Sequence, residues 1–204
     1  MIADYLTRRL SGTWLEPPRP LSKRYERIFF GLTLAAIGFA VAVRLYGINY
    51  SLWGDEIAST VFAREPVWRL WSDWIIRETN PPLFYTILHY WILVFGQSDV
   101  TVKLLATIFG VANIIVVAVI ARQLGGSWLP ALVTVLFVSV NPSHILYSQN
   151  ARAFTLGAFA ASIVCLMLIR IMRKHENTSA NDVTSKDWGL FGLALLISLY
   201  THTT

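Results

Sequence analysis

Four long apolar runs limit what this chain can fold into. Each approaches the roughly 20 mostly apolar residues that a membrane-crossing helix needs, and a fifth run begins at Asp187. The four are Ile28–Tyr46, Leu104–Ala121, Leu129–Tyr147 and Ala153–Ile169. Only 14% of the residues are charged and the mean hydropathy is +0.53, whereas soluble domains carry about 25% charged residues. We therefore predict an all-α polytopic membrane protein with about five transmembrane helices.

Lysine and arginine gather at two places, and this bias predicts the orientation. Six precede the first apolar run and three follow the fourth: Arg8, Arg9, Arg19, Lys23, Arg24 and Arg27, then Arg170, Arg173 and Lys174. Because cytoplasmic flanks of spans are enriched in these residues, we expect residues 1–27 and the segment after the fourth span in the cytoplasm. The same flanks account for the net charge of +5, so the charge does not argue for nucleic-acid binding.

Residues 48–99 are expected to form one extracytoplasmic loop of amphipathic helices. The apolar stretch Leu83–Phe95 would rise only about 20 Å as a helix, short of a hydrocarbon core of about 30 Å. In Pro66–Arg77, charged residues recur every four positions among tryptophans. That pattern predicts a helix at the membrane interface. A helix packed on other protein, with the same charged stripe exposed, remains an equal alternative.

The loop contains six of the twelve acids of the chain, two of them adjacent in the stretch SLWGDEIAST. Asp55 is well placed to cap a helix that starts at Glu56, since both charges suit a helix N-terminus. A cap also fixes a carboxylate in space, as an active site requires. Asp55 and Glu56 are therefore our candidates for catalytic residues, with helix capping as the alternative.

Other polar residues are expected at the same membrane face. Glu78 and Asn80 lie in the segment ETNPPL, which ends one helix and starts the next or is only a turn. Lys103 stands at the outer end of the second span, where a lone lysine is often a membrane anchor. Arg152 ends a polar return between two spans that also contains Tyr147 and Gln149. An arginine there must reach water or pair with an anion, for which a lipid phosphate would serve.

The order of these motifs resembles the N-terminal part of glycosyltransferases of the GT-C membrane class, from about Arg44 onward. WGDE follows the first span, then come NPPLFY, FGQSDVTVKL, and finally an Asn-Pro pair with YSQNARAF. The group that looks most similar contains the protein O-mannosyltransferases and the lipid A aminoarabinose transferases. The resemblance implies that residues 28–204 are the N-terminal part of a GT-C-like transmembrane domain.

The resemblance also implies an activity and roles for these residues. Such a protein would move a sugar, with inversion, from a polyprenyl-phosphate carrier to a glycan, lipid or protein acceptor on the extracytoplasmic face. Asp55, beside Glu56, would be the general base. Lys103 and Arg152 would hold the departing phosphate. Glu78, Asn80, Tyr147 and Gln149 would complete the substrate site.

This chain departs from the family pattern at three positions. Asn80 replaces a histidine common in relatives, Lys103 replaces an arginine, and no Asp follows Arg152. The last difference weakens a metal site, so we predict no metal ligands, and the cofactor stays unknown, with a divalent cation as an open alternative. The group usually continues through more spans, so a fragment or truncated product is expected. The alternative function is a non-catalytic scaffold, lipid-binding subunit or transporter part.

Overall fold

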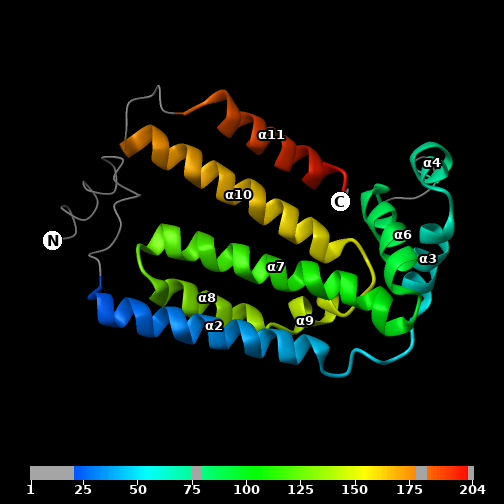
Figure 1. Cartoon of the computed structure of the whole chain (residues 1–204), viewed down its shortest axis with the longest axis horizontal. Helices are drawn as coiled ribbons and strands as arrows, with labels where there is room; N and C mark the ends of the chain where they lie inside the picture. The colour runs from blue at the N-terminus through cyan, green and yellow to red at the C-terminus, as the bar shows by residue number, and fades with distance from the viewer. Residues whose placement is uncertain (1–20, 75–79, 178–182, 202–204) are drawn as a thin grey trace.

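The computed structural model describes residues 21–74, 80–177 and 183–201, and the regular structure in these ranges is helical. Figure 1 shows that the longer helices run along the long axis of the molecule, with shorter ones grouped at one end. The longer helices are α2 (Lys23–Leu45), α7 (Asp99–Gly125), α8 (Trp128–Val140), α10 (Phe154–Asn177) and α11 (Ser185–Leu199). Between them, α7 packs against α8 and α10, α2 against α8, and α10 against α11.

In the described part of the chain, three helices are long and apolar enough to cross a membrane: α2, α7 and the Phe154–Lys174 part of α10. They overlap three of the predicted spans. The apolar run Leu104–Ala121 is shorter than α7. Helix α7 begins earlier because a polar cap sets its start, in which Ser98 accepts a hydrogen bond from the Thr101 N–H. Several such helices in one chain indicate a multi-pass membrane protein.

The predicted span Leu129–Tyr147 is broken in two. Helix α8 ends before Asn141, and α9 (Pro142–Ser148) continues at an angle of 69°. Pro142 has no N–H for the carbonyl of Val138, and Asn141 caps the new helix by accepting from the His144 N–H at 3.0 Å. The pair counts as a fourth candidate span if the two parts are taken together.

The predicted fifth span corresponds to α11, which has 15 residues. A helix of that length rises about 22 Å, less than the hydrocarbon core of about 30 Å. The described residues therefore provide three or four candidate spans, against about five expected from the sequence.

The segment expected as a loop forms a small helical cluster at one end of the bundle (Figure 1). Its elements are α3 (Gly54–Arg64), α4 (Val67–Arg69), a π-helical turn η1 (Leu70–Trp74) and α6 (Leu83–Phe95). Helix α6 has the bounds of the predicted short helix. The helix predicted over Pro66–Arg77 is instead one short α-helical turn followed by the π turn, and residues 75–79 lie outside the described part.

Two apolar clusters hold the molecule together. One joins α2, α7 and α8 through small side chains such as Ala36, Ala40 and Ala118, which let helix backbones approach closely. The other fixes the helical cluster to the bundle, because Phe84 and Leu88 of α6 pack with Leu105 of α7 and Leu156 of α10. The second cluster also contains Ala63 near the end of α3 and Ala151 and Ala153 just before α10, so it holds α3 beside the turn where the candidate residues lie.

Candidate functional site

Helix α3 starts two residues earlier than the sequence suggested, and a different acid caps it. The helix begins at Gly54 with Trp53 as the N-cap residue. The carboxylate of Glu56 accepts a hydrogen bond from the Trp53 N–H at 3.1 Å. Glu56 thus makes the capping contact that we assigned to Asp55, because it stands at the third helical position, from which a side chain reaches back to the cap.

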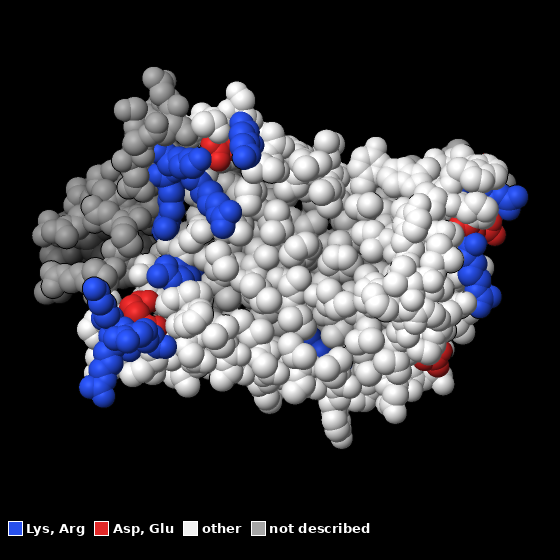
Figure 2. All heavy atoms as spheres, viewed as in Figure 1, with Lys and Arg blue, Asp and Glu red and all other residues white. Residues whose placement is uncertain are grey.

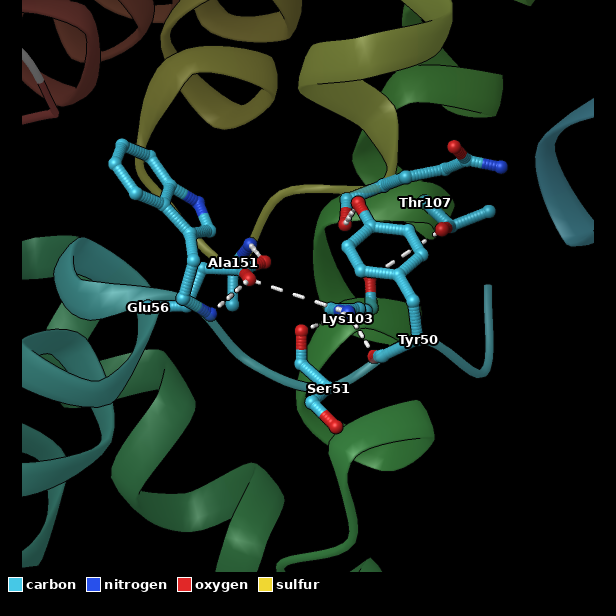
Figure 3. A network of polar contacts seen from close by, with 8 residues as sticks. Tyr50, Ser51, Glu56, Lys103, Thr107 and Ala151 are labelled. Atoms are coloured by element: carbon cyan, nitrogen blue, oxygen red, sulfur yellow. Dashed lines mark hydrogen bonds and ion pairs between the residues drawn. The ribbon is translucent and has the colours of Figure 1, made fainter. Parts of the chain in front are cut away.

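Glu56 is fully buried and ties two distant parts of the chain together (Figure 3). Its Oε1 atom accepts a hydrogen bond from the Ala151 N–H at 2.8 Å. Its Oε2 atom lies 3.9 Å from Nζ of Lys103, whose side chain is also fully buried. A buried carboxylate needs such partners, since burying an unpaired charge is costly.

The Lys103 ammonium group is occupied by internal contacts. It donates to the backbone carbonyls of Tyr50 and Ser51 and lies 3.2 Å from the centroid of the Tyr50 ring. The two carbonyls use two of the three donors of the ammonium group, and Glu56 adds an ion pair at 3.9 Å without a hydrogen bond. Lys103 therefore holds residues 50–51 and α3 in place, with a side chain that is fully buried; Figure 3 shows its contacts.

Tyr50 connects this network to the turn after α9. Its hydroxyl donates to the Gln149 carbonyl at 3.1 Å. Burial, and then the negative charge of Glu56, raise the pKa of Tyr50 above its ordinary value. Both causes disfavour the tyrosinate, so the hydroxyl keeps its proton and its donor role at neutral pH.

Gln149 and Tyr147, both predicted to bind substrate, have structural contacts. The Gln149 amide donates to the carbonyls of Arg44 and Tyr46 at 3.0 and 2.8 Å. These carbonyls are among those that α2 leaves free at its C-terminal end. The Tyr147 ring packs on Phe154 with centroids 4.7 Å apart and is 42% exposed. Of the two residues, Tyr147 keeps an exposed surface for a ligand.

Asp55 and Arg152 remain available. Asp55 is exposed and Arg152 partly buried, and neither side chain forms a hydrogen bond or ion pair with another described residue. Each is the chain neighbour of a residue in the 2.8 Å hydrogen bond between Glu56 and Ala151. That bond therefore brings an unpaired carboxylate, that of Asp55, and an unpaired guanidinium group, that of Arg152, into the same region.

Two buried polar atoms near Arg152 also lack partners. Among the residues that the structure describes, the side-chain oxygens Oδ1 of Asn150 and Oγ1 of Thr155 find no hydrogen-bond partner, although these residues are only 7% and 3% exposed. Buried polar groups in native proteins are nearly always bonded, and an exception calls for an explanation such as a bound ligand or water. The turn 150–155 thus contains a cation and an unused hydroxyl donor.

The remaining candidates lie in the segment between η1 and α6. Glu78 is outside the described residues. Asn80 is partly buried in a bend just before Pro81 and Pro82, where α6 begins. Its side chain or backbone takes part in an interaction, so Asn80 is not free.

The sequence did not reveal a second polar cluster, centred on Arg44. This side chain is fully buried and bonds to Nδ1 of His144 at 2.9 Å and to the Val138 carbonyl at 3.1 Å. His144 in turn contacts the Asn113 amide at 3.2 Å, and Ser162 donates to Asn113 at 2.7 Å. One signal could have indicated it, because an arginine near the end of an apolar span must find polar partners.

Within the described ranges, no three His, Cys, Asp or Glu side chains are grouped so that they could hold a metal ion. Searches of protein families, curated proteins and solved structures find no match to this chain. The site is thus built on a buried Glu56, which is paired with Lys103 and whose hydrogen bond to Ala151 brings Asp55 and Arg152 to one region of a multi-pass membrane protein.

Proposed function

We propose that this chain is part of a membrane glycosyltransferase that transfers a sugar from a polyprenyl-phosphate carrier to an acceptor hydroxyl, with inversion. Asp55 acts as the general base and Arg152 binds the carrier phosphate. The observation that supports the proposal is the Glu56–Ala151 hydrogen bond, because the exposed Asp55 is the chain neighbour of Glu56 and Arg152 is the chain neighbour of Ala151.

The chemistry requires both charges. The acceptor hydroxyl attacks the anomeric carbon and gives its proton to Asp55, while the bond between this carbon and the phosphate oxygen breaks. The departing phosphate gains negative charge, so a fixed cation stabilises the transition state more than the ground state. The unpaired hydroxyl of Thr155 is a further donor for the phosphate.

The proposal assigns Glu56 and Lys103 to support of the site. Both are buried and bonded to protein groups, so neither is free to meet a substrate. They act as positioning residues that hold α3 against the turn before α10. Tyr147 keeps a substrate-binding role through its exposed ring surface, and Glu78 and Asn80 remain candidates for acceptor contacts.

We further propose that the site faces the extracytoplasmic side. Figure 2 shows many lysine and arginine side chains at the end of the molecule where α2 begins, and an almost uncharged band between the two ends. A basic cytoplasmic flank and an apolar band are what the positive-inside bias leads one to expect. The helical cluster with Asp55 lies at the opposite end (Figure 1).

The test is sugar transfer from labelled polyprenyl-phosphate donors in membranes that contain the full reading frame. We expect Asp55→Asn to lower the transfer rate by about 10²- to 10⁴-fold, the usual contribution of a general base. Asp73→Asn, another exposed acid of the same segment, should leave the rate unchanged. Equal rates in wild type and Asp55→Asn would reject Asp55 as the base.

A non-catalytic lipid-binding protein is the second candidate, favoured by the burial of Lys103, which leaves only one of two expected cations for the phosphate. It would use Arg152 in the same way but would not need Asp55. Lipid-phosphate binding that depends on Arg152, together with no transfer from any donor, would identify this second function.

A further inference from the structure

A cavity of about 350 Å³ lies between α10 and α11, and its nine lining residues are all apolar. From α10 these are Leu156, Phe159, Ala160, Ile163 and Met167, and from α11 Leu190, Leu193, Ala194 and Ile197. This volume falls in the range of about 300–1,000 Å³ that is typical of ligand pockets.

The lining residues recur every three or four positions on each helix, so they form two facing stripes. From Leu156 to Met167 the α10 stripe extends over roughly 16 Å at 1.5 Å per residue. Because α10 is a candidate span, the stripe lies within the apolar depth of the membrane. An apolar cavity at that depth does not hold water and suits a hydrocarbon chain.

One end of the cavity is close in the chain to the candidate site. Leu156, where the α10 stripe starts, follows Arg152 by four residues, and the buried Thr155, whose hydroxyl lacks a partner, is its neighbour. At the other helix, Tyr200 packs on Trp71 of η1 with ring centroids 5.7 Å apart. The Ile197 end of α11 therefore also lies at the end of the bundle where the helical cluster sits, as Figure 1 shows.

This arrangement matches an amphiphile with an anionic head and a long apolar tail. The unpaired arginine and the unused hydroxyl suit a phosphate, and the apolar stripe that begins at Leu156, four residues after Arg152, suits the chain attached to it. A protein partner would require no cation at this end, and a free phosphate would require no apolar cavity.

We propose that the α10–α11 cavity binds the first isoprene units of the carrier lipid whose phosphate lies at Arg152. This inference rests on the proposed function for the identity of the lipid, but it concerns binding and not transfer. The carrier would then enter the site from the membrane between α10 and α11, with its sugar directed toward Asp55.

The test is photo-crosslinking in phosphatidylcholine nanodiscs with farnesyl phosphate that carries a diazirine at the far end of its chain. We expect label on the cavity residues of α10 and α11, and competition by unlabelled farnesyl phosphate. Dimethylallyl phosphate, which has a single isoprene unit, should compete far less well. Label spread over other helices, or equal competition by the short phosphate, would overturn the proposal.

A variant that fills the cavity and a control variant on the same helix test the site further. Ala160→Trp places a large side chain in the cavity, whereas Ala158→Trp adds the same side chain on the exposed face of the same helix. We expect Ala160→Trp to lower crosslinking several-fold and Ala158→Trp to leave it unchanged. Ala194→Phe fills the cavity from α11 and should act like Ala160→Trp, so one misfolded variant does not decide the outcome.

Two further arms separate this proposal from its alternatives. A phosphatidylglycerol with a diazirine on its acyl chain should not label the cavity in the presence of farnesyl phosphate; labelling that farnesyl phosphate fails to displace would assign the cavity to a phospholipid. Asp55→Asn should keep the crosslink. Crosslinking without any sugar transfer would support the lipid site and reject the glycosyltransferase. Sugar transfer without crosslinking would support the glycosyltransferase and reject the lipid site.

Discussion

At the scale of single residues, the Glu56 carboxylate is the most constrained acid of the candidate site. It accepts hydrogen bonds from the N–H groups of Trp53 and Ala151 and faces Lys103. Neither the Glu56 nor the Lys103 side chain is exposed to solvent. Removing one partner of such a buried pair leaves the other charge uncompensated.

A double-mutant cycle measures this coupling. Glu56→Gln and Lys103→Met should each destabilise the protein by about 3–5 kcal/mol, as expected when one member of a buried pair is lost. The double variant should lose less than the sum of the two, because no unpaired charge remains. The measurement is thermal unfolding in detergent. Strict additivity would show that the two charges do not interact.

Tyr50 provides a pH-dependent readout of the same network. Burial and the Glu56 charge raise its pKa, so the folded state prefers the neutral phenol. Its contribution to stability is fully present below the ordinary tyrosine pKa of about 10. It is lost as the pH rises through the higher pKa of the folded protein, because the unfolded chain ionises first.

We therefore expect the tyrosinate absorbance of wild type minus that of Tyr50→Phe to show one group that titrates above pH of about 10. Glu56→Gln should move this titration downward without restoring the ordinary value, since burial is the larger cause. A Tyr50 titration that Glu56→Gln leaves unchanged would exclude the charge effect.

The sequence indicated the acidic pair but could not divide the roles within it. Asp55 and Glu56 are adjacent, so the start of α3 decides which side chain turns inward, and the start was placed two residues too late. The partners of Glu56 also come from Lys103 and Ala151, which are far away in the chain. No local pattern contains such contacts.

At the scale of the elements, the break between α8 and α9 is the main departure from a simple bundle. The break frees carbonyls at the end of α8, and Arg44 of α2 donates to those of Val138 and Ser139 at 3.1 and 3.5 Å. In a membrane such groups have no water to bond. Arg44 therefore stabilises the broken span from a neighbouring helix.

Replacing this arginine should weaken the bundle. We expect Arg44→Gln to cost about 1–3 kcal/mol, chiefly because the Ser139 carbonyl loses its donor, whereas the Val138 carbonyl still accepts from the Asn141 N–H at 3.4 Å. Arg24→Gln, which changes an exposed arginine at the start of the same helix, should have little effect. Thermal unfolding in detergent compares the two. Equal stability of both variants would show that the carbonyls do not depend on Arg44.

Hydrophobic patterns predicted the elements better than their ends and breaks. Helix α6 was found with its bounds because Pro82 and Gly96 delimit an unbroken apolar run. The predicted span Leu129–Tyr147 contains the break at Asn141. Because α8 and α9 are both apolar, a hydropathy window that covers them does not detect the break. The π turn η1 likewise follows an amphipathic pattern that is also compatible with a regular helix.

At the scale of the whole molecule, charge and connectivity can be tested together. The helical cluster with Trp68 lies at one end of the bundle, and the start of α11 with Lys186 lies at the other (Figure 1). Between these two residues the chain passes through α7, the bent pair α8–α9, and α10. Because α8 and α9 carry the chain back along the bundle, three crossings should separate Trp68 from Lys186.

A pair of cysteine variants decides the number of crossings and their direction. Trp68 is 64% exposed and Lys186 is exposed, and the native Cys165, also exposed, is first replaced by alanine. An impermeant thiol reagent should label Trp68→Cys in intact cells and Lys186→Cys only after permeabilisation. The opposite pattern would invert the orientation and place Asp55 in the cytoplasm. Equal access to both sites would mean that the chain crosses the membrane twice between them. Helices α7 and α10 alone return the chain to the side on which it started, so the α8–α9 pair would then be a re-entrant loop.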